Sequence, residues 1–158
     1  DSQALVHSAG IQFAGTQVAN AGANVLDDYE EGTFGTTSAN GILYPLTSGT
    51  ITCGTIATCH YTKIGRVVSI TVRAIVTASS SPVGYLGLVL PFACVGFPVG
   101  AVRLTNVTFS GYMTVQADNA DSNAKFTEIA TGSAISYIAG SDLSADDELR
   151  LELTYFTS

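Results

Sequence analysis

The chain has 158 residues, of which 46% are apolar and only 12% are charged, against roughly 25% charged residues in an ordinary soluble domain. Six basic and thirteen acidic residues give a net charge of −7, so the chain lacks the basic surface that binds nucleic-acid phosphates. No segment reaches the ~18 uninterrupted apolar residues of a membrane helix. We therefore expect one domain, with no nucleic-acid partner and no membrane insertion.

The low charge has two explanations that act together. Neutral polar residues are abundant, with 19 Thr and 15 Ser, and these residues suit strands and turns better than helices. Some of the surface must also be covered by partner chains, because a charge-poor globule solvates its exposed surface poorly.

The first 32 residues fit neither helical nor strand periodicity, and we interpret residues 1–32 as an extended N-terminal arm that links the domain to an upstream one. The chain begins at Asp1 without a Met or a secretory leader, which indicates a piece cut from a longer protein. Residues 33–158 consist of short β-prone runs separated by turn dipeptides such as Asn40-Gly41 and Ser81-Pro82.

Two strands are clear from alternation of side chains. In Arg66–Thr77, one face carries Val68, Ile70, Val72, Ala74 and Val76, and we expect this face in the core. The other face is mixed rather than charged, which suits packing against a neighbouring chain. The last run alternates in the same way, with Leu149, Leu151, Leu153 and Tyr155 on its buried side.

Five shorter runs lie between these strands: Tyr85–Leu90, Ala101–Asn106, Gly111–Ala117, Lys125–Ala130 and Ala134–Ala139. Their spacing predicts an all-β sandwich or barrel. Only Ala23–Glu31 and Asp142–Glu148, the latter capped by Ser141, have the composition for a helix, and neither is long enough to determine the fold.

Three cysteines, Cys53, Cys59 and Cys94, form an odd count that argues against a disulfide framework. Zinc is disfavoured because CxxC and HxxxH spacings are absent. We expect three buried core thiols, no metal and no cofactor.

Four carboxylates crowd around Tyr29: Asp27, Asp28, Glu30 and Glu31. Like charges held close together raise one pKa, as in a general acid and base pair or a cation site. The alternative is a solvated acidic turn or helix end, and it is favoured because no nucleophile or positioned base stands nearby.

A second polar group precedes Lys125. Three side chains have the one-three-five spacing of a calcium loop: Asn119, Asp121 and Asn123. The match then fails, because Ala124 and Ala130 stand where the loop needs Gly and a bidentate Glu. A solvated turn is favoured over a weaker calcium site or a sugar-contacting loop.

Tyrosines near turns are a further class of candidates, namely Tyr85, Tyr112 and Tyr137, because an exposed tyrosine packs well on a sugar or a partner. Each of them also fits a half-buried position in a sheet. No nucleophile motif and no phosphate-binding loop is present.

Several segments together resemble bacteriophage tail fibre and tailspike proteins. The stretch from Ile11 to Phe34, with Leu-Asp-Asp-Tyr-Glu-Glu-Gly at positions 26–32, is similar to their junction segment. The His60–Val68 run resembles the first long strand of their C-terminal domain, Leu90-Pro91-Phe92 resembles their "LPF" segment, and Asp142–Thr157 resembles their closing strand. This chain departs from those proteins after Phe34, because it continues with Gly35-Thr36-Thr37 where they usually continue with Thr-Pro.

This resemblance implies a homotrimeric, antiparallel, jelly-roll-like β-sandwich at the distal end of a phage tail fibre or tailspike. It implies a virion protein assembled in the host cytoplasm that trimerises with itself and binds a host surface glycan or outer-membrane receptor. We expect a non-enzymatic module whose binding residues lie on loops: Tyr85, Tyr112, Asp118, Asn119, Asp121, Asn123 and Lys125.

Two alternatives remain open. The domain could be a purely structural trimerisation cap, with recognition or depolymerase activity in another domain. It could also be a depolymerase that uses Asp27 with Glu30 or Glu31, which is disfavoured because catalysis in such spikes usually belongs to a separate upstream domain.

Overall fold

The computed structural model describes residues 5–7, 10–12, 29–35, 41–54, 58–107, 109, 111–130, 132 and 134–158, with backbone alone for 5–7 and 10–12. Its elements are the strands β1 (Leu5–His7), β2 (Gly10–Gln12), β3 (Tyr29–Thr33), β4 (Leu43–Pro45), β5 (Ser48–Cys53), β6 (Thr58–Ile64), β7 (Val67–Val83), β8 (Leu86–Val89), β9 (Val99–Thr105), β10 (Tyr112–Ala117), β11 (Asn123–Ile129), β12 (Ser136–Tyr137) and β13 (Glu148–Phe156), and the 3-10 turn η1 (Gly140–Asp142). The expectation of an all-β chain is confirmed. The bounds of β8 to β12 differ from the five expected runs by at most two residues.

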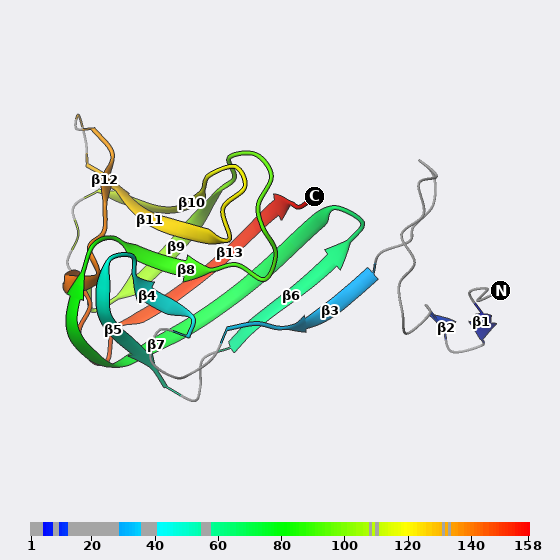
Figure 1. Cartoon of the computed structure of the whole chain (residues 1–158), viewed down its shortest axis with the longest axis horizontal. Helices are drawn as coiled ribbons and strands as arrows, with labels where there is room; N and C mark the ends of the chain where they lie inside the picture. Colours follow the sequence, from blue (N-terminus) through cyan, green and yellow to red (C-terminus); the bar gives the residue numbers. More distant parts are fainter. Residues whose placement is uncertain are drawn as a thin grey trace.

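The two longest strands pair as their alternation requires. β13 lies antiparallel to β7 from Glu148 opposite Ile75 to Phe156 opposite Val67 (Figure 1). In this register every inward residue of one strand faces an inward residue of the other, such as Leu151 opposite Val72. The predicted core faces of both strands are confirmed, since all of their inward residues are buried.

One continuous antiparallel sheet makes up the body. Its strand order is β3-β6-β7-β13-β9-β10-β11-β8-β4, with β12 beside β11 and β5 beside the far half of β7. β9 pairs with β13 through Val102–Thr105 and with β10 through Val99–Ala101, so it joins the two halves. The sheet curls, so that β4 at its far end lies close to β7 (Figure 1). β1 and β2 form a separate two-stranded sheet.

The concave side of the curl holds the core. Phe126 on β11 is its largest fully buried side chain, and it lies among Leu, Ile and Val side chains from both halves of the sheet. The prediction of core thiols is confirmed, because Cys53, Cys59 and Cys94 are free and buried. Burial raises the pKa of Cys59 to about 12.

Both expected helices differ from the structure. In Ala23–Glu31, residues 29–31 belong to β3, and 23–28 lie outside the described residues. Asp142–Glu148 forms no helix, because its carboxylates close turns: Asp142 accepts a hydrogen bond from the Ala139 amide and Asp147 accepts one from the Ser144 amide. Asp146 also adopts a positive φ of 72°, which interrupts helical geometry.

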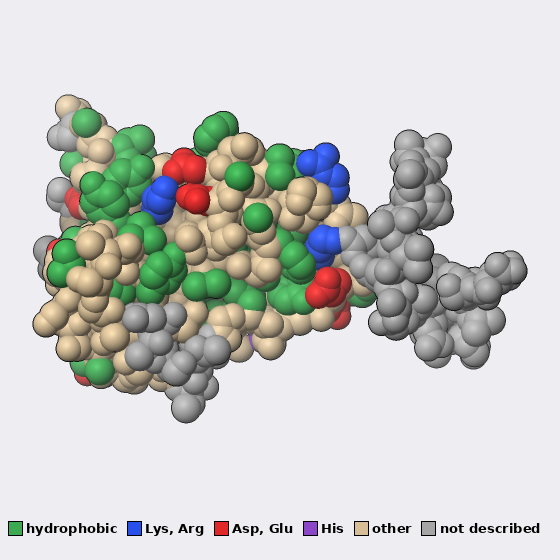
Figure 2. Space-filling view, in the orientation of Figure 1, with side chains coloured by type: hydrophobic (Ala, Val, Ile, Leu, Met, Phe, Trp, Pro, Cys, Tyr) green, Lys and Arg blue, Asp and Glu red, His purple; other side chains and the backbone are tan. Residues whose placement is uncertain are grey.

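The arm expected over residues 1–32 is only partly described, and the expected boundary at residue 33 falls within β3, which pairs with β6. No helix in the described parts of the chain is long and apolar enough to cross a membrane. Figure 2 shows the low charge on one face, where the few charged side chains occur in small groups among uncharged ones.

Candidate functional site

The outer, convex face of β3, β6, β7, β13 and β9 carries the side chains that alternate with the buried or half-buried ones on these strands. Because the strands are in register, side chains on this face form rows that cross the sheet. One end of the face is apolar, its middle carries hydroxyl groups such as the pair Ser69 and Thr154, and the other end carries arginines.

The apolar end is a continuous row of four side chains from four neighbouring strands. Each is directly opposite the next, and between 36% and 56% of each is exposed: Tyr29, Ile64, Val67 and Phe156. We call this set the apolar row. An exposed apolar group of this kind is typical of a surface that contacts another chain.

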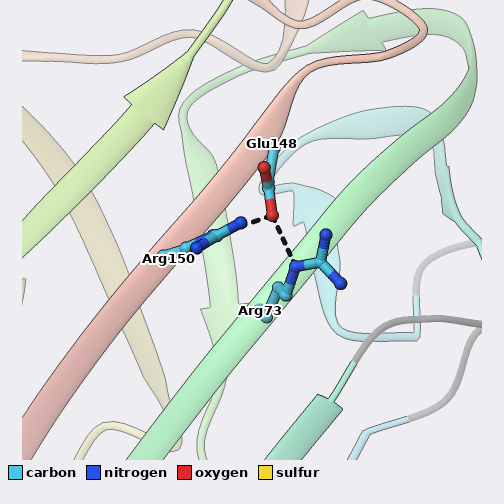
Figure 3. A network of polar contacts seen from close by, with 3 residues as sticks. All are labelled: Arg73, Glu148 and Arg150. Carbon is cyan, nitrogen blue, oxygen red and sulfur yellow. Dashed lines mark hydrogen bonds and ion pairs between the residues drawn. The ribbon is translucent and has the colours of Figure 1, made fainter.

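The arginine end joins three adjacent strands. Arg150 on β13 is opposite Arg73 on β7 and opposite Arg103 on β9, and we call these three residues the arginine row. Glu148 lies between two of the guanidinium groups (Figure 3) and accepts hydrogen bonds from Arg73 Nε at 2.5 Å and from Arg150 Nε at 2.8 Å. The hydrogen bonds from Arg150 and Arg73 lower the pKa of the Glu148 carboxyl to about 2.

Sequence reasoning missed the arginine row. Alternation places Arg73 and Arg150 on outer faces, but a single strand shows only one arginine. The row exists because the register of β7, β13 and β9 brings together residues that are far apart in sequence. Predicting the row would have required knowing which strands pair and in which register.

The five polar candidates gather at the turn between β10 and β11. Lys125 Nζ lies 2.7 Å from Asp118 Oδ2 and 3.3 Å from Asp121 Oδ2, and these carboxylates raise the pKa of the lysine. Asn119 Oδ1 accepts a hydrogen bond from the Gly96 amide at 2.9 Å, and Asn123 begins β11. The positive charge of Lys125 thus already offsets the negative charges of Asp118 and Asp121 in this turn.

The tyrosine candidates lie elsewhere. Tyr85 stacks on Tyr137, with ring centroids 4.5 Å apart and 28° between the planes, while half of Tyr85 is exposed. Tyr112 begins β10, at the opposite end of the β10–β11 hairpin from the polar turn, and it is 76% exposed. The seven candidate residues therefore fall in three places: five in the polar turn, Tyr85 stacked on Tyr137, and Tyr112 at the other end of the hairpin.

Of the carboxylates proposed as an acid and base pair, the structure describes only Glu30 and Glu31, the two alternative partners of Asp27. Glu30 and Glu31 are neighbours on β3 and point to opposite faces of the sheet. The hydroxyl of Tyr61 donates a hydrogen bond to Glu30, and that of Tyr29 donates one to Glu31. Asp27 and Asp28 lie outside the described residues.

Residues of the phage-like segments meet around Tyr61. Its ring makes edge contacts with Phe34 and Phe92, at centroid distances of 6.4 and 5.3 Å. Gly32 lies directly opposite Tyr61, where a Cβ would come within 2.7–2.9 Å of the ring and its hydroxyl oxygen. This glycine is required by the close approach of the ring.

Phe92 also links these segments to the last strand. The hydroxyl of Tyr155 donates a hydrogen bond to the Phe92 carbonyl oxygen at 3.2 Å, and burial raises the pKa of Tyr155 to about 12. Lys63 Nζ lies 5.6 Å from the centre of the Phe92 ring. Phe92 therefore packs against side chains of β6 and β13, and these contacts hold the phage-like segments together in the fold.

The chain resembles a solved phage protein in fold. No family model and no curated protein sequence matches it. The crystal structure of the Dettilon tailspike protein superposes with a TM-score of 0.64 and 17% sequence identity, covering 81% of this chain and 24% of that one. The chain thus spans about a quarter of that tailspike's length, and the two share a tailspike-like fold.

Proposed function

We propose that this chain is a non-enzymatic module of a phage tailspike or tail fibre, which forms a homotrimer and binds a host cell-surface receptor, a glycan. The observation that carries this proposal is the fold shared with the Dettilon tailspike over 81% of the chain. The phage-like segments found in the sequence agree with it, and residues from them meet around Tyr61 in the structure. In this proposal the protein belongs to the virion tail and is assembled in the host cytoplasm.

The apolar row supports self-association. Its four side chains carry no charge, and they lie on the outer face of the long strands, where a neighbouring chain would pack. In a trimer this row would bury its apolar area against a second copy, and the curled sheets would form the three jelly-roll-like sandwiches of the trimer. Three weak receptor sites on one rigid trimer gain from effective concentration.

The exposed aromatic residues support a binding role. Tyr85 and Tyr112 present ring surface to solvent, and aromatic rings pack on the apolar faces of sugars. The polar turn that contains Asp118, Asn119 and Asp121 adds hydrogen-bonding groups at another edge. Glu30 and Glu31 each accept a tyrosine hydrogen bond, which disfavours either of them as the catalytic partner of Asp27.

A purely structural trimerisation cap is the second candidate, because the apolar row favours association whether or not the module binds a receptor. Upstream domains of the same fibre or spike would then carry recognition or depolymerase activity. The two candidates differ in whether this chain alone binds a host glycan.

Sedimentation equilibrium of the whole chain tests trimerisation. We expect three times the 16.3 kDa mass of one chain, and Phe156→Ser should lower this mass at equal concentration. Phe97→Ser is the matched control, since Phe97 is 76% exposed outside the row and its loss should leave the mass unchanged. A monomeric wild-type chain would contradict the proposed trimer.

Receptor binding is tested on an array of host-envelope glycans probed with the assembled chain. We expect binding to at least one glycan, and release of no reducing ends from it. Binding to none, with trimer assembly intact, would replace the receptor-binding proposal with the structural cap. Release of reducing ends would overturn the non-enzymatic assignment.

A further inference from the structure

The arginine row concentrates half of the chain's basic residues at one place. The chain carries six basic residues in all and a net charge of −7, yet three arginines stand side by side on the outer face. Like charges directly opposite each other destabilise a sheet. Glu148 offsets this repulsion through hydrogen bonds to Arg73 and Arg150.

The guanidinium groups keep most of their hydrogen-bonding capacity. Arg73 and Arg150 both use Nε for Glu148 (Figure 3), and their terminal amino groups have no hydrogen-bond or ion-pair partner within the described part of the chain. Arg103 is exposed and forms no ion pair or side-chain hydrogen bond with any described residue. Glu148 therefore positions two of the groups and leaves donors on all three available.

A hollow in the outer face lies against these donors. It has a volume of about 470 Å³, and its lining includes the three arginines, Ala101 and Glu152. The short side chain of Ala101, two residues before Arg103 on the same face of β9, leaves the space open. The volume falls in the range of ~300–1,000 Å³ typical of small-molecule sites.

An exposed ring stands on the next strand. Thr114 of β10 is opposite Ala101, and Tyr112 lies two residues from Thr114 on the same face of the strand. Tyr112 is 76% exposed, and an exposed tyrosine ring on the neighbouring strand offers a surface for a sugar ring.

We propose that the arginine row binds the carboxylate or phosphate group of an anionic sugar residue, with Arg103 as the principal contact and Glu148 as a positioning residue. The planar fork of a guanidinium group matches both anions with two parallel hydrogen bonds. This inference names the ligand class of the receptor and so rests on the proposed function. None of the seven sequence candidates lines this hollow, and Tyr112 on the next strand shares its face of the sheet.

Titration calorimetry of the whole chain at low salt tests the site with three probes: trigalacturonate for a carboxylate, mannose 6-phosphate for a phosphate, and maltotriose as a neutral sugar. We expect at least one anionic probe to bind and maltotriose to bind at least tenfold more weakly. The probe that binds more tightly identifies which anion the site prefers. No binding of either anionic probe would overturn the proposal.

Variants separate a built site from diffuse attraction. Arg103→Gln should weaken binding about tenfold or more, as expected for a lost charge-assisted hydrogen bond, and Glu152→Gln should strengthen it. Arg66→Gln is the matched control, because it removes the same charge just before β7 begins, seven residues or roughly 23 Å from Arg73 along an extended chain, and should change binding less than twofold. Equal weakening by Arg66→Gln and Arg103→Gln would overturn the proposal.

Two further results distinguish this inference from the proposed function. If Arg103→Gln leaves binding to a host glycan unchanged, the arginine row is not the receptor site, although receptor binding itself stands. If Arg103→Gln instead lowers the oligomeric mass, the row contacts carboxylates of a second copy and the sugar site is overturned. Thermal unfolding of each variant verifies that the exposed substitutions leave the fold intact.

Discussion

The contact between Gly32 and Tyr61 allows a sharp test of how the phage-like segments hold the domain together. In Gly32→Ala, the new Cβ would lie 2.7, 2.8 and 2.9 Å from Oη, Cε1 and Cζ of Tyr61. The ring must retreat by about 0.5–0.7 Å to restore the 3.4 Å of ordinary contact. It is held on its other sides by Glu30, Phe34 and Phe92.

The expected cost follows from what the ring loses when it moves. Each aromatic edge contact contributes about 0.5–1.5 kcal/mol beyond its buried area, and the tyrosine hydrogen bond contributes about 0.5–1.5 kcal/mol. Alanine recovers about 0.5–1 kcal/mol because glycine loses more backbone entropy on folding. We expect Gly32→Ala to lower the free energy of unfolding by about 1–3 kcal/mol, the usual cost of overpacking.

A double-mutant cycle isolates the contact. Tyr61→Leu removes all three atoms that the Cβ would meet and retains an apolar side chain. In this background Gly32→Ala should be neutral or stabilising, so urea unfolding should give a coupling free energy of at least about 1 kcal/mol. An equal loss of stability in both backgrounds would refute the reasoning.

Three further predictions follow from buried and paired groups. Tyr155→Phe removes the hydroxyl that donates to the Phe92 carbonyl and should lower the free energy of unfolding by about 1–2 kcal/mol, measured in urea; no loss would show that the bond contributes nothing. The pKa of Glu148 is lowered from 4.5 to about 2, so its contribution to stability is present above pH 4.5 and is lost as the pH falls toward 2. Glu148→Gln should flatten the dependence of the urea midpoint on pH in this window, and an unchanged slope would contradict the pairing. Burial and a pKa raised to about 12 should make Cys59 resist iodoacetamide at pH 8 until urea unfolds the chain, as followed by mass spectrometry.

Alternation within one strand was sufficient to predict the core faces of the two longest strands. Val68 to Val76 and Leu149 to Tyr155 read as inward faces from sequence alone, since a strand's period of two depends only on its own residues. The all-β class and the spans of β8 to β12 followed from such local patterns. The curl of one continuous sheet did not, because it depends on which strands pair.

Predicting the candidate site required knowledge of strand pairing even more than predicting the curl did. Arg73, Arg103 and Arg150 lie on three strands, and nothing local indicates that they share a row. The turn at Asp118–Lys125 was predicted as a turn, but the ion pairs within it needed side-chain geometry. The expected helix at Asp142–Glu148 failed because short acidic side chains cap turns as readily as helices.

The position of β13 between β7 and β9 has a kinetic consequence. Its partners on β7 lie roughly 70–90 residues earlier in the chain, so the centre of the sheet closes only after a long loop is drawn together. Until β13 is in place, β7 and β9 each present an open edge that would pair readily with another chain. We therefore expect slow folding whose last step joins the two halves of the sheet, and a ribosome-bound chain that ends before Glu148 should be captured by aggregation or by chaperones.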